Sequence, residues 1–198
     1  MARSKLINPS DDLVSDSGAV LWSFIKGEQL EFPITMNFIE NATAGYTYEA
    51  VVVEADNVAK QTDTPINIKT NGHQTVLNVR VPVYRGTWNG TQAYNREEIV
   101  FYNGMYYKLL AGIARTVQDI TPAADPSWEE TTLNRVYLQF PASLGSNWAV
   151  QPEVGFPMYG FFELRVTEPS DAIFRRTWKP VRGMVEILFS PTDIVADI

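Results

Sequence analysis

Aromatic side chains are densest between Tyr84 and Leu110, in the stretch YRGTWNGTQAYNREEIVFYNGMYYKLL. The rings that gather there are those of Trp88, Tyr94, Phe101, Tyr102, Tyr106 and Tyr107. Flat, exposed rings stack on sugar rings, whereas buried rings supply the large apolar area that a very small module needs for a core. The stretch therefore has two interpretations, a glycan-binding surface or the core of a small module.

Residues that could catalyse a reaction are few. The only histidine, His73, follows an Asn-Gly turn in TNGHQ and is expected to be an exposed loop residue. Six glutamates could supply a carboxylate pair for glycoside hydrolysis, but no pattern brings two of them together across a cleft. They are Glu28, Glu31, Glu97, Glu98, Glu129 and Glu130. We therefore expect no enzyme and no catalytic residue.

Metal and cofactor sites are not indicated either. Asp11, Asp12, Asp16 and Asp56 lack the regular spacing of a calcium loop, and a zinc site would have His73 as its one histidine ligand. The chain has no cysteine, which excludes disulfides and thiolate chemistry. The sequence predicts no metal and no cofactor.

Composition and charge narrow the class of protein. The 198 residues are 45% hydrophobic and 20% charged, a globular balance, and the net charge is −7. No segment gathers Lys and Arg, so a nucleic-acid partner is not expected. The N-terminal residues have no apolar signal-peptide core, and no apolar run approaches the roughly 20 residues of a membrane span.

Strand patterns dominate the chain, and helical periodicity is nearly absent. Alternating apolar residues mark Leu30–Met36, Val76–Val83 and Phe162–Val166, and Val51–Val53 indicates a buried strand. The predicted fold is all-β: an immunoglobulin-like β-sandwich of about seven strands, with a small inserted β-module. We expect an N-terminal arm at 1–19, a discontinuous sandwich at 20–83 and 132–198, and the insert at 84–131.

A β-hairpin is predicted inside the insert, because Asn103-Gly104 joins two short strand patterns and favours a type I′ turn. Alternation along the second strand places Tyr106 and Tyr107 on opposite faces. Tyr106 is therefore the best candidate for an exposed ring.

The insert resembles the small chitin- and cellulose-binding modules of secreted chitinases. The resemblance is carried, in order, by Trp88, Tyr94, Ile99-Val100, Tyr102, Gly104, Tyr107 and Trp128. Glu97-Glu98 stands where that family commonly has Gly-Asp. The exposed rings that bind sugar in that family follow the last hairpin tyrosine, and this chain has Lys108-Leu109-Leu110-Ala111 there.

This departure favours the core interpretation. Tyr94, Tyr102 and Tyr107 are expected to form the core of the insert, together with Trp88 and Trp128. The alternative is that one or two rings contact a glycan, and the carbohydrate-binding candidates are then Trp88, Tyr106 and Trp128.

The flanking halves resemble immunoglobulin-like domains of tailed-phage virion proteins of the baseplate or tail-fibre adaptor type. The resemblance lies in KGEQLEFPITMNF, MYGFFELRVTE and WKPVRGMVEILFSP. It implies a non-enzymatic structural component of a virion, in the tail, baseplate or fibre or as capsid decoration. Its partners would be other virion proteins and symmetric copies of itself, with host-surface glycan for host attachment. Arg175-Arg176 beside Trp178 could form a cation–π contact or a partner-facing patch, and the alternative is an ordinary surface loop.

A dedicated carbohydrate-binding protein that recognises a β-linked glycan through the insert remains the alternative function. With no signal peptide expected, the protein would be made in the host cytoplasm and reside in the virion.

Overall fold

Strands alone make up the regular structure in the described part of this computed structural model, residues 13–14, 19–56, 67–69, 71–110, 120–148, 157–170 and 175–188. The long strands of the larger sheet are β2 (Ala19–Ile25), β3 (Leu30–Thr35), β4 (Thr47–Asp56), β6 (Gln74–Arg80), β11 (Arg135–Phe140), β12 (Met158–Thr167) and β13 (Thr177–Leu188). Two-residue strands β1 (Leu13–Val14) and β5 (Asn67–Ile68) pair with β3 and β4. The all-β prediction is confirmed.

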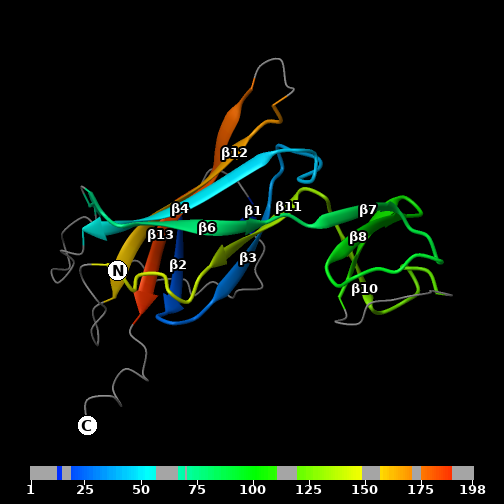
Figure 1. Cartoon of the computed structure of the whole chain (residues 1–198), viewed down its shortest axis with the longest axis horizontal. Coiled ribbons are helices and arrows are strands. Elements are labelled where there is room, and N and C mark those ends of the chain that lie inside the picture. Colours follow the sequence, from blue (N-terminus) through cyan, green and yellow to red (C-terminus); the bar gives the residue numbers. More distant parts are fainter. Residues whose placement is uncertain are drawn as a thin grey trace, which may run out of the picture.

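The larger sheet folds over on itself at β6. Its strand order is β1-β3-β11-β6-β4-β12-β13-β2. One half of β6 pairs with β4 through Gln74–Leu77, and the other half pairs with β11 through Asn78–Arg80. One layer is thus β3-β11-β6 and the other is β4-β12-β13-β2, and β2 runs parallel to β13 (Figure 1). These neighbours match the B-E-D and C-F-G pairings of an immunoglobulin-type sandwich.

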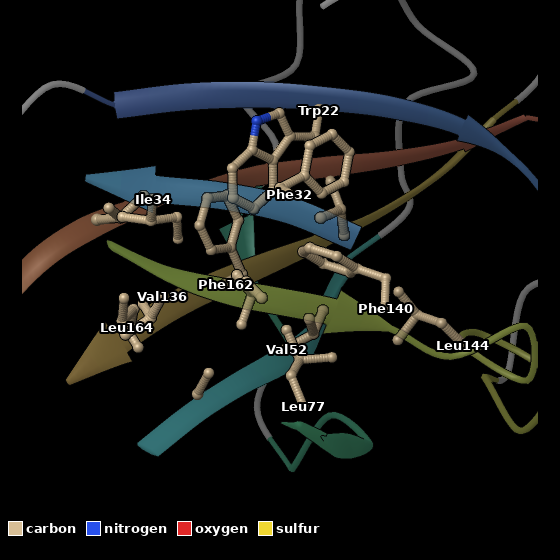
Figure 2. Packing of buried hydrophobic residues seen from close by; sticks show 14 of the residues in the cluster. Trp22, Phe32, Ile34, Val52, Leu77, Val136, Phe140, Leu144, Phe162 and Leu164 are labelled. Atoms are coloured by element: carbon tan, nitrogen blue, oxygen red, sulfur yellow. The ribbon is translucent and has the colours of Figure 1, made fainter. Parts of the chain in front are cut away.

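The core lies between the two layers, as Figure 2 shows. Trp22 of β2 is stacked between Phe32 of β3, at 4.6 Å between ring centroids, and Phe162 of β12, at 4.3 Å. Phe140 of β11 contacts Trp22 edge-on at 5.2 Å. Phe32 and Phe162 each lie between less buried neighbours along their strands, so the alternation read from the sequence is what closes the sandwich.

A second, smaller sheet contains β7 (Val83–Thr87), β8 (Glu98–Tyr102), β9 (Met105–Leu109) and β10 (Trp128–Thr131), in the order β10-β9-β8-β7. We call residues 83–131 the module. It lies at one end of the molecule, beyond the ends of β6 and β11 (Figure 1). Asn103 and Gly104 both have positive φ, 50° and 89°, as the predicted type I′ turn requires.

Four element boundaries differ from the sequence predictions. The alternating segment Val76–Val83, which predicts one strand, is interrupted at Val81-Pro82, where Pro82 lacks the N–H of a ladder, and β7 joins the module sheet instead. Trp128–Thr131, for which no strand was predicted, pairs with β9 as an edge strand. Thr177–Pro180, for which no strand was predicted either, begins β13.

The fourth difference lies in the N-terminal arm, of which Leu13–Val14 forms a strand on β3 and Ala19 begins β2. The rest of the arm lies outside the described residues, as does the C-terminal tail after Leu188.

Candidate functional site: the aromatic module and its junction

The module is built around its own aromatic core. Tyr94, Val100, Leu109 and Trp128 are buried together, and Trp88 and Tyr107 pack against them. The Tyr94 ring meets Trp128 edge-on at 5.6 Å. Its hydroxyl accepts a hydrogen bond from the Asn89 N–H at 2.8 Å, so the buried phenol is satisfied.

Two of the carbohydrate-binding candidates lie at this core rather than on an open surface. Trp128 is only 6% exposed, which leaves no ring face for a sugar, and it is dropped as a binding residue. Trp88 is half-buried and meets Tyr102 edge-on at 5.4 Å. At the positions where the small chitin- and cellulose-binding modules that the insert resembles carry exposed rings, Leu109 is buried and Leu110 is exposed.

Tyr106 lies on the opposite side of the sheet from Tyr107, as expected, and it is not alone there. The Tyr106 ring lies 5.8 Å from Tyr84 and 5.1 Å from Phe101, and all three side chains are half-buried. We call these three residues the outer aromatic cluster. The rings are inclined by 76° and 53°, an edge-to-face arrangement rather than one flat platform. Burial, with Tyr106 nearby, raises the pKa of Tyr84, which keeps its hydroxyl protonated.

That Tyr84 and Phe101 lie beside Tyr106 was not predicted from the sequence. Phe101 pairs directly with Tyr106 across the hairpin, and Tyr84 pairs with Ile99 in a parallel β7–β8 ladder. The hairpin turn was a sufficient signal for the Phe101–Tyr106 pair. The parallel pairing of β7 with β8 has no local signal in the sequence.

A charged and aromatic junction joins the module to the sandwich. Arg80, at the end of β6, lies with its guanidinium carbon 4.1 Å from the centroid of the Tyr137 ring. The same guanidinium pairs with Glu31 of β3 at 2.5 Å and with Glu97 of the module at 3.4 Å. Gln139 also donates a hydrogen bond to Glu31, at 2.5 Å. One arginine thus contacts both units.

Lys108 of β9 approaches the same tyrosine from the module. Its Nζ donates to the Tyr137 hydroxyl at 3.3 Å and lies 3.5 Å from a Glu129 carboxylate oxygen. Lys108 is only 9% exposed. Burial acts to lower the pKa of Lys108, but Tyr137, Glu97 and Glu129 outweigh burial and raise it. Lys108 is therefore a charged contact of the junction.

The expected carboxylates do not form an acid–base pair. Glu31 and Glu97 do converge, but on the Arg80 guanidinium. Burial acts to raise the pKa of Glu31, and the hydrogen bonds from Arg80 and Gln139 outweigh it, so the pKa lies below its ordinary value. A glycosidase acid needs a raised pKa, so this arrangement suits structure rather than proton transfer.

The remaining candidate carboxylates accept local hydrogen bonds, are exposed, or lie outside the described residues. Glu98 is buried and accepts a hydrogen bond from the Asn95 N–H at 2.9 Å, and Glu28 accepts one from Ile25 N–H at 3.3 Å. Glu130 is exposed on β10. Asp11, Asp12 and Asp16 lie outside the described residues, as does the side chain of Asp56.

The described residues contain no group of three or more His, Asp or Glu side chains suited to a metal ion. His73 is exposed, as expected. In the same part of the chain, no helix has the length and apolar character needed to cross a membrane.

The arginine patch near the end of the sandwich contains a cation–π contact. The Arg176 guanidinium carbon lies 5.3 Å from the centroid of the Trp178 ring. A nitrogen of the same guanidinium forms an ion pair with Glu168 at 2.8 Å. The Phe38 ring lies 5.1 Å from the Trp178 ring, centroid to centroid. A partner role for Arg175 and Arg176 stays a prediction.

Comparisons with protein-family models, with curated proteins and with solved structures found no match to this chain.

Proposed function

We propose that this protein is a non-enzymatic structural component of a tailed-phage virion, in the tail, baseplate or fibre or as capsid decoration. In this role the sandwich joins other virion proteins, and the module projects from the assembled particle toward the host surface. The proposal starts from the resemblance of the strand motifs to phage adaptor domains.

The junction is the observation that carries the proposal. Arg80 of the sandwich pairs with Glu97 of the module, and Tyr137 of the sandwich accepts a hydrogen bond from Lys108 of the module. The Arg80 guanidinium also lies over the Tyr137 ring, close to the two points at which the chain passes between the units. Units joined only by a flexible linker move independently, whereas a linker supported by buried contacts holds one orientation. A projecting part with a defined direction suits a symmetric assembly, in which every copy must point the same way.

Locating the protein on particles tests this function. Antibody fragments raised against the module should label intact particles of the phage that encodes the chain, at positions that follow the particle symmetry in electron micrographs. Mass spectrometry of gradient-purified particles should detect the protein at a constant ratio to the major capsid protein. Absence from purified particles would refute the proposal.

Glycan binding by the module is a second candidate function, and the outer aromatic cluster is the observation that favours it. Tyr84, Phe101 and Tyr106 offer partly exposed rings on the face away from the module core. Stacking on such rings gives weak contacts, which many copies on one particle turn into useful avidity.

A glycan array separates the two functions. If the module binds sugar, Tyr106→Ala should abolish the signal, while Val83→Ala, at an exposed module residue outside the outer aromatic cluster, should keep it. Silence of the unaltered protein on chitin, cellulose and host polysaccharides would remove the glycan function and leave the structural one.

A further inference from the structure

The outer face of β4, β12 and β13 carries a contiguous group of apolar side chains among its charged ones. Phe162, Leu164 and Val52 point into the core, so the residues between them point outward. These outward residues include Val51 and Val53 of β4, Phe161 of β12 and Met184 of β13, next to Val76 of β6. We call these five residues the outer valine face.

The strand register places these side chains side by side. Val53 pairs with Phe161, which pairs with Met184, so three apolar side chains form one row across three strands. Val51 pairs with Val76, and this second apolar pair adjoins the row on β4. Val76 is 77% exposed and the other four are half-buried. Antiparallel sheets that face water alternate apolar-in with polar-out, and a contiguous apolar patch on such a face marks an interaction site.

Opposite charges stand on either side of the row, on the same strand and the same face. Arg182 lies two residues before Met184, and Glu186 lies two residues after it. Ser23 and Tyr159 donate hydrogen bonds to Glu186 at 2.5 and 3.1 Å, which hold its carboxylate in place.

Arg182 has no such support. Its cross-strand neighbour Glu163 is paired with Lys179 at 2.8 Å, and in the described part of the chain the Arg182 side chain has no ion pair or hydrogen bond.

We propose that the outer valine face is the contact between two copies of this chain. A two-fold axis that runs across the strands, along the row of Val53, Phe161 and Met184, stacks the two rows face to face. The same axis places Arg182 of each copy opposite Glu186 of the other, which forms two intermolecular ion pairs. Packed sheets stand about 10 Å apart, a spacing that these apolar side chains fill.

The charge pattern favours a second copy over a different protein. An isologous contact requires a self-complementary surface, and one positive and one negative residue at equal distances from a central row meet that requirement. The two charges also cancel within each copy. The other charged side chains of this face are two carboxylates and two cations that pair with one another, Glu49, Glu163, Arg165 and Lys179. The face is therefore close to neutral although the whole chain carries −7. The inference rests on the proposed function for its purpose, since paired sandwiches would supply a symmetric unit of assembly.

Charge exchange in the full-length chain tests the contact directly. Sedimentation velocity across a concentration series should show a dimer of the unaltered protein. Arg182→Glu and Glu186→Arg should each raise the dissociation constant by about tenfold or more, because each places like charges opposite one another. Arg96→Glu, the same charge reversal at an exposed module residue, should leave it unchanged. Circular dichroism checks that each variant is folded.

Mixing the two reversed variants provides the decisive result. One variant then carries Glu at positions 182 and 186 and the other carries Arg at both, so the geometry predicts that they associate with each other while neither self-associates. Recovery of a 1:1 dimer supports the two-fold contact. A monomer at every concentration, a dimer that ignores both reversals, or a mixture that stays monomeric overturns it, the last pointing to a different partner.

Cross-linking gives a second readout that does not depend on charge. Because the chain has no cysteine, Met184→Cys introduces a single thiol, and the proposed axis brings two copies of it to roughly the 10 Å spacing of packed sheets. A short bismaleimide should link this variant into dimers, and Met105→Cys, at an exposed module position, should stay unlinked. Equal linking of both variants contradicts the contact. A monomer in solution removes this face alone, whereas absence from purified particles removes the virion function alone.

Discussion

Arg80 holds the junction between the sandwich and the module. Its guanidinium stacks on Tyr137 and pairs with Glu31 and Glu97, so one side chain contacts residues from three separate parts of the sequence. Planar geometry and permanent charge allow arginine to make such contacts at once, and a lysine cannot reproduce them.

Arg80→Met should therefore lower the free energy of unfolding by about 1–3 kcal/mol, because Glu31 keeps only Gln139 as a partner and the ring contact loses its charge. The matched control is Arg96→Met, at a side chain that is 66% exposed and lies 3.7 Å from a Glu97 oxygen. That change should stay within about 0.5 kcal/mol. Urea denaturation measures both, and equal effects would show that the junction adds nothing beyond a surface ion pair.

The low pKa of Glu31 predicts an acid sensitivity of the junction. Since the folded pKa lies below the ordinary value of 4.5, the unfolded chain takes up the proton first as the pH falls. The stabilisation from the ionised carboxylate is complete above the unfolded pKa and is lost as the pH falls through the folded pKa.

The difference in unfolding free energy between the unaltered protein and Glu31→Gln should accordingly be constant from about pH 7 to pH 5 and shrink as the pH drops to about 3. Comparing the two proteins cancels the contribution of Glu163, whose pKa is also lowered, first by its hydrogen bond from Lys179. A difference that does not change with pH would contradict the role given to Glu31.

Residue alternation along the strands predicted correctly which side chains point inward and which point outward. It separated Tyr106 from Tyr107 and the inward from the outward residues of β12, because side-chain direction in a strand depends only on parity. It did not find the contacts of Arg80 with Glu31 or Tyr137, which are 49 and 57 positions away along the chain. Such contacts depend on strand pairing that no local pattern encodes.

Among the elements, the hairpin of β8 and β9 was the most predictable. Asn103-Gly104 has a backbone requirement that few residue pairs satisfy, so the turn defined both strands. The edge strand β10 was missed because Glu129, Glu130 and Thr131 are polar. It becomes a strand only by pairing with β9, which the long segment between them conceals.

The backbone conformation of the hairpin turn can be tested at Gly104. A Cβ on Gly104 would meet no atom within 4 Å, so Gly104→Ala tests backbone strain without a clash. We expect a loss of about 1 kcal/mol in unfolding free energy, because alanine disfavours the positive φ of 89°.

Gly104→Asn is the matched control for this prediction and should cost less, since asparagine visits that region more readily. Thermal or urea unfolding measures the pair. An alanine variant as stable as the unaltered protein would exclude a strained turn.

Across the whole molecule, the described residues form two hydrophobic clusters that share no residue. Among these residues, the sandwich core includes no side chain from residues 83–131, and the module core includes none from outside that range. The sequence predicted this division, because the dense aromatic residues that begin at Tyr84 follow directly on the alternating aliphatic residues of Val76–Val83. The residues through which the module contacts the sandwich were not predictable, because Lys108 and Tyr137 come together only when both units are folded.

Two independent cores predict that the sandwich folds without the module. Arg80 of β6 already pairs with Tyr137 of β11, so the ends left by removing residues 84–131 lie on neighbouring strands and a short Gly-Ser linker can join them. We expect the shortened chain to unfold cooperatively, with its unfolding free energy reduced by about 1–2 kcal/mol for the lost contacts of Lys108 and Glu97 with the sandwich.

Tryptophan fluorescence reports the unfolding of the shortened chain directly, because Trp22 and Trp148 remain buried in the sandwich core while Trp88 and Trp128 are removed. Trp22→Ala in the shortened chain serves as the control and should abolish the cooperative transition, since it removes the ring stacked between Phe32 and Phe162. A shortened chain that is expanded and lacks a transition would show instead that the junction is part of the folding unit, and the module would then be required for the sandwich rather than carried by it.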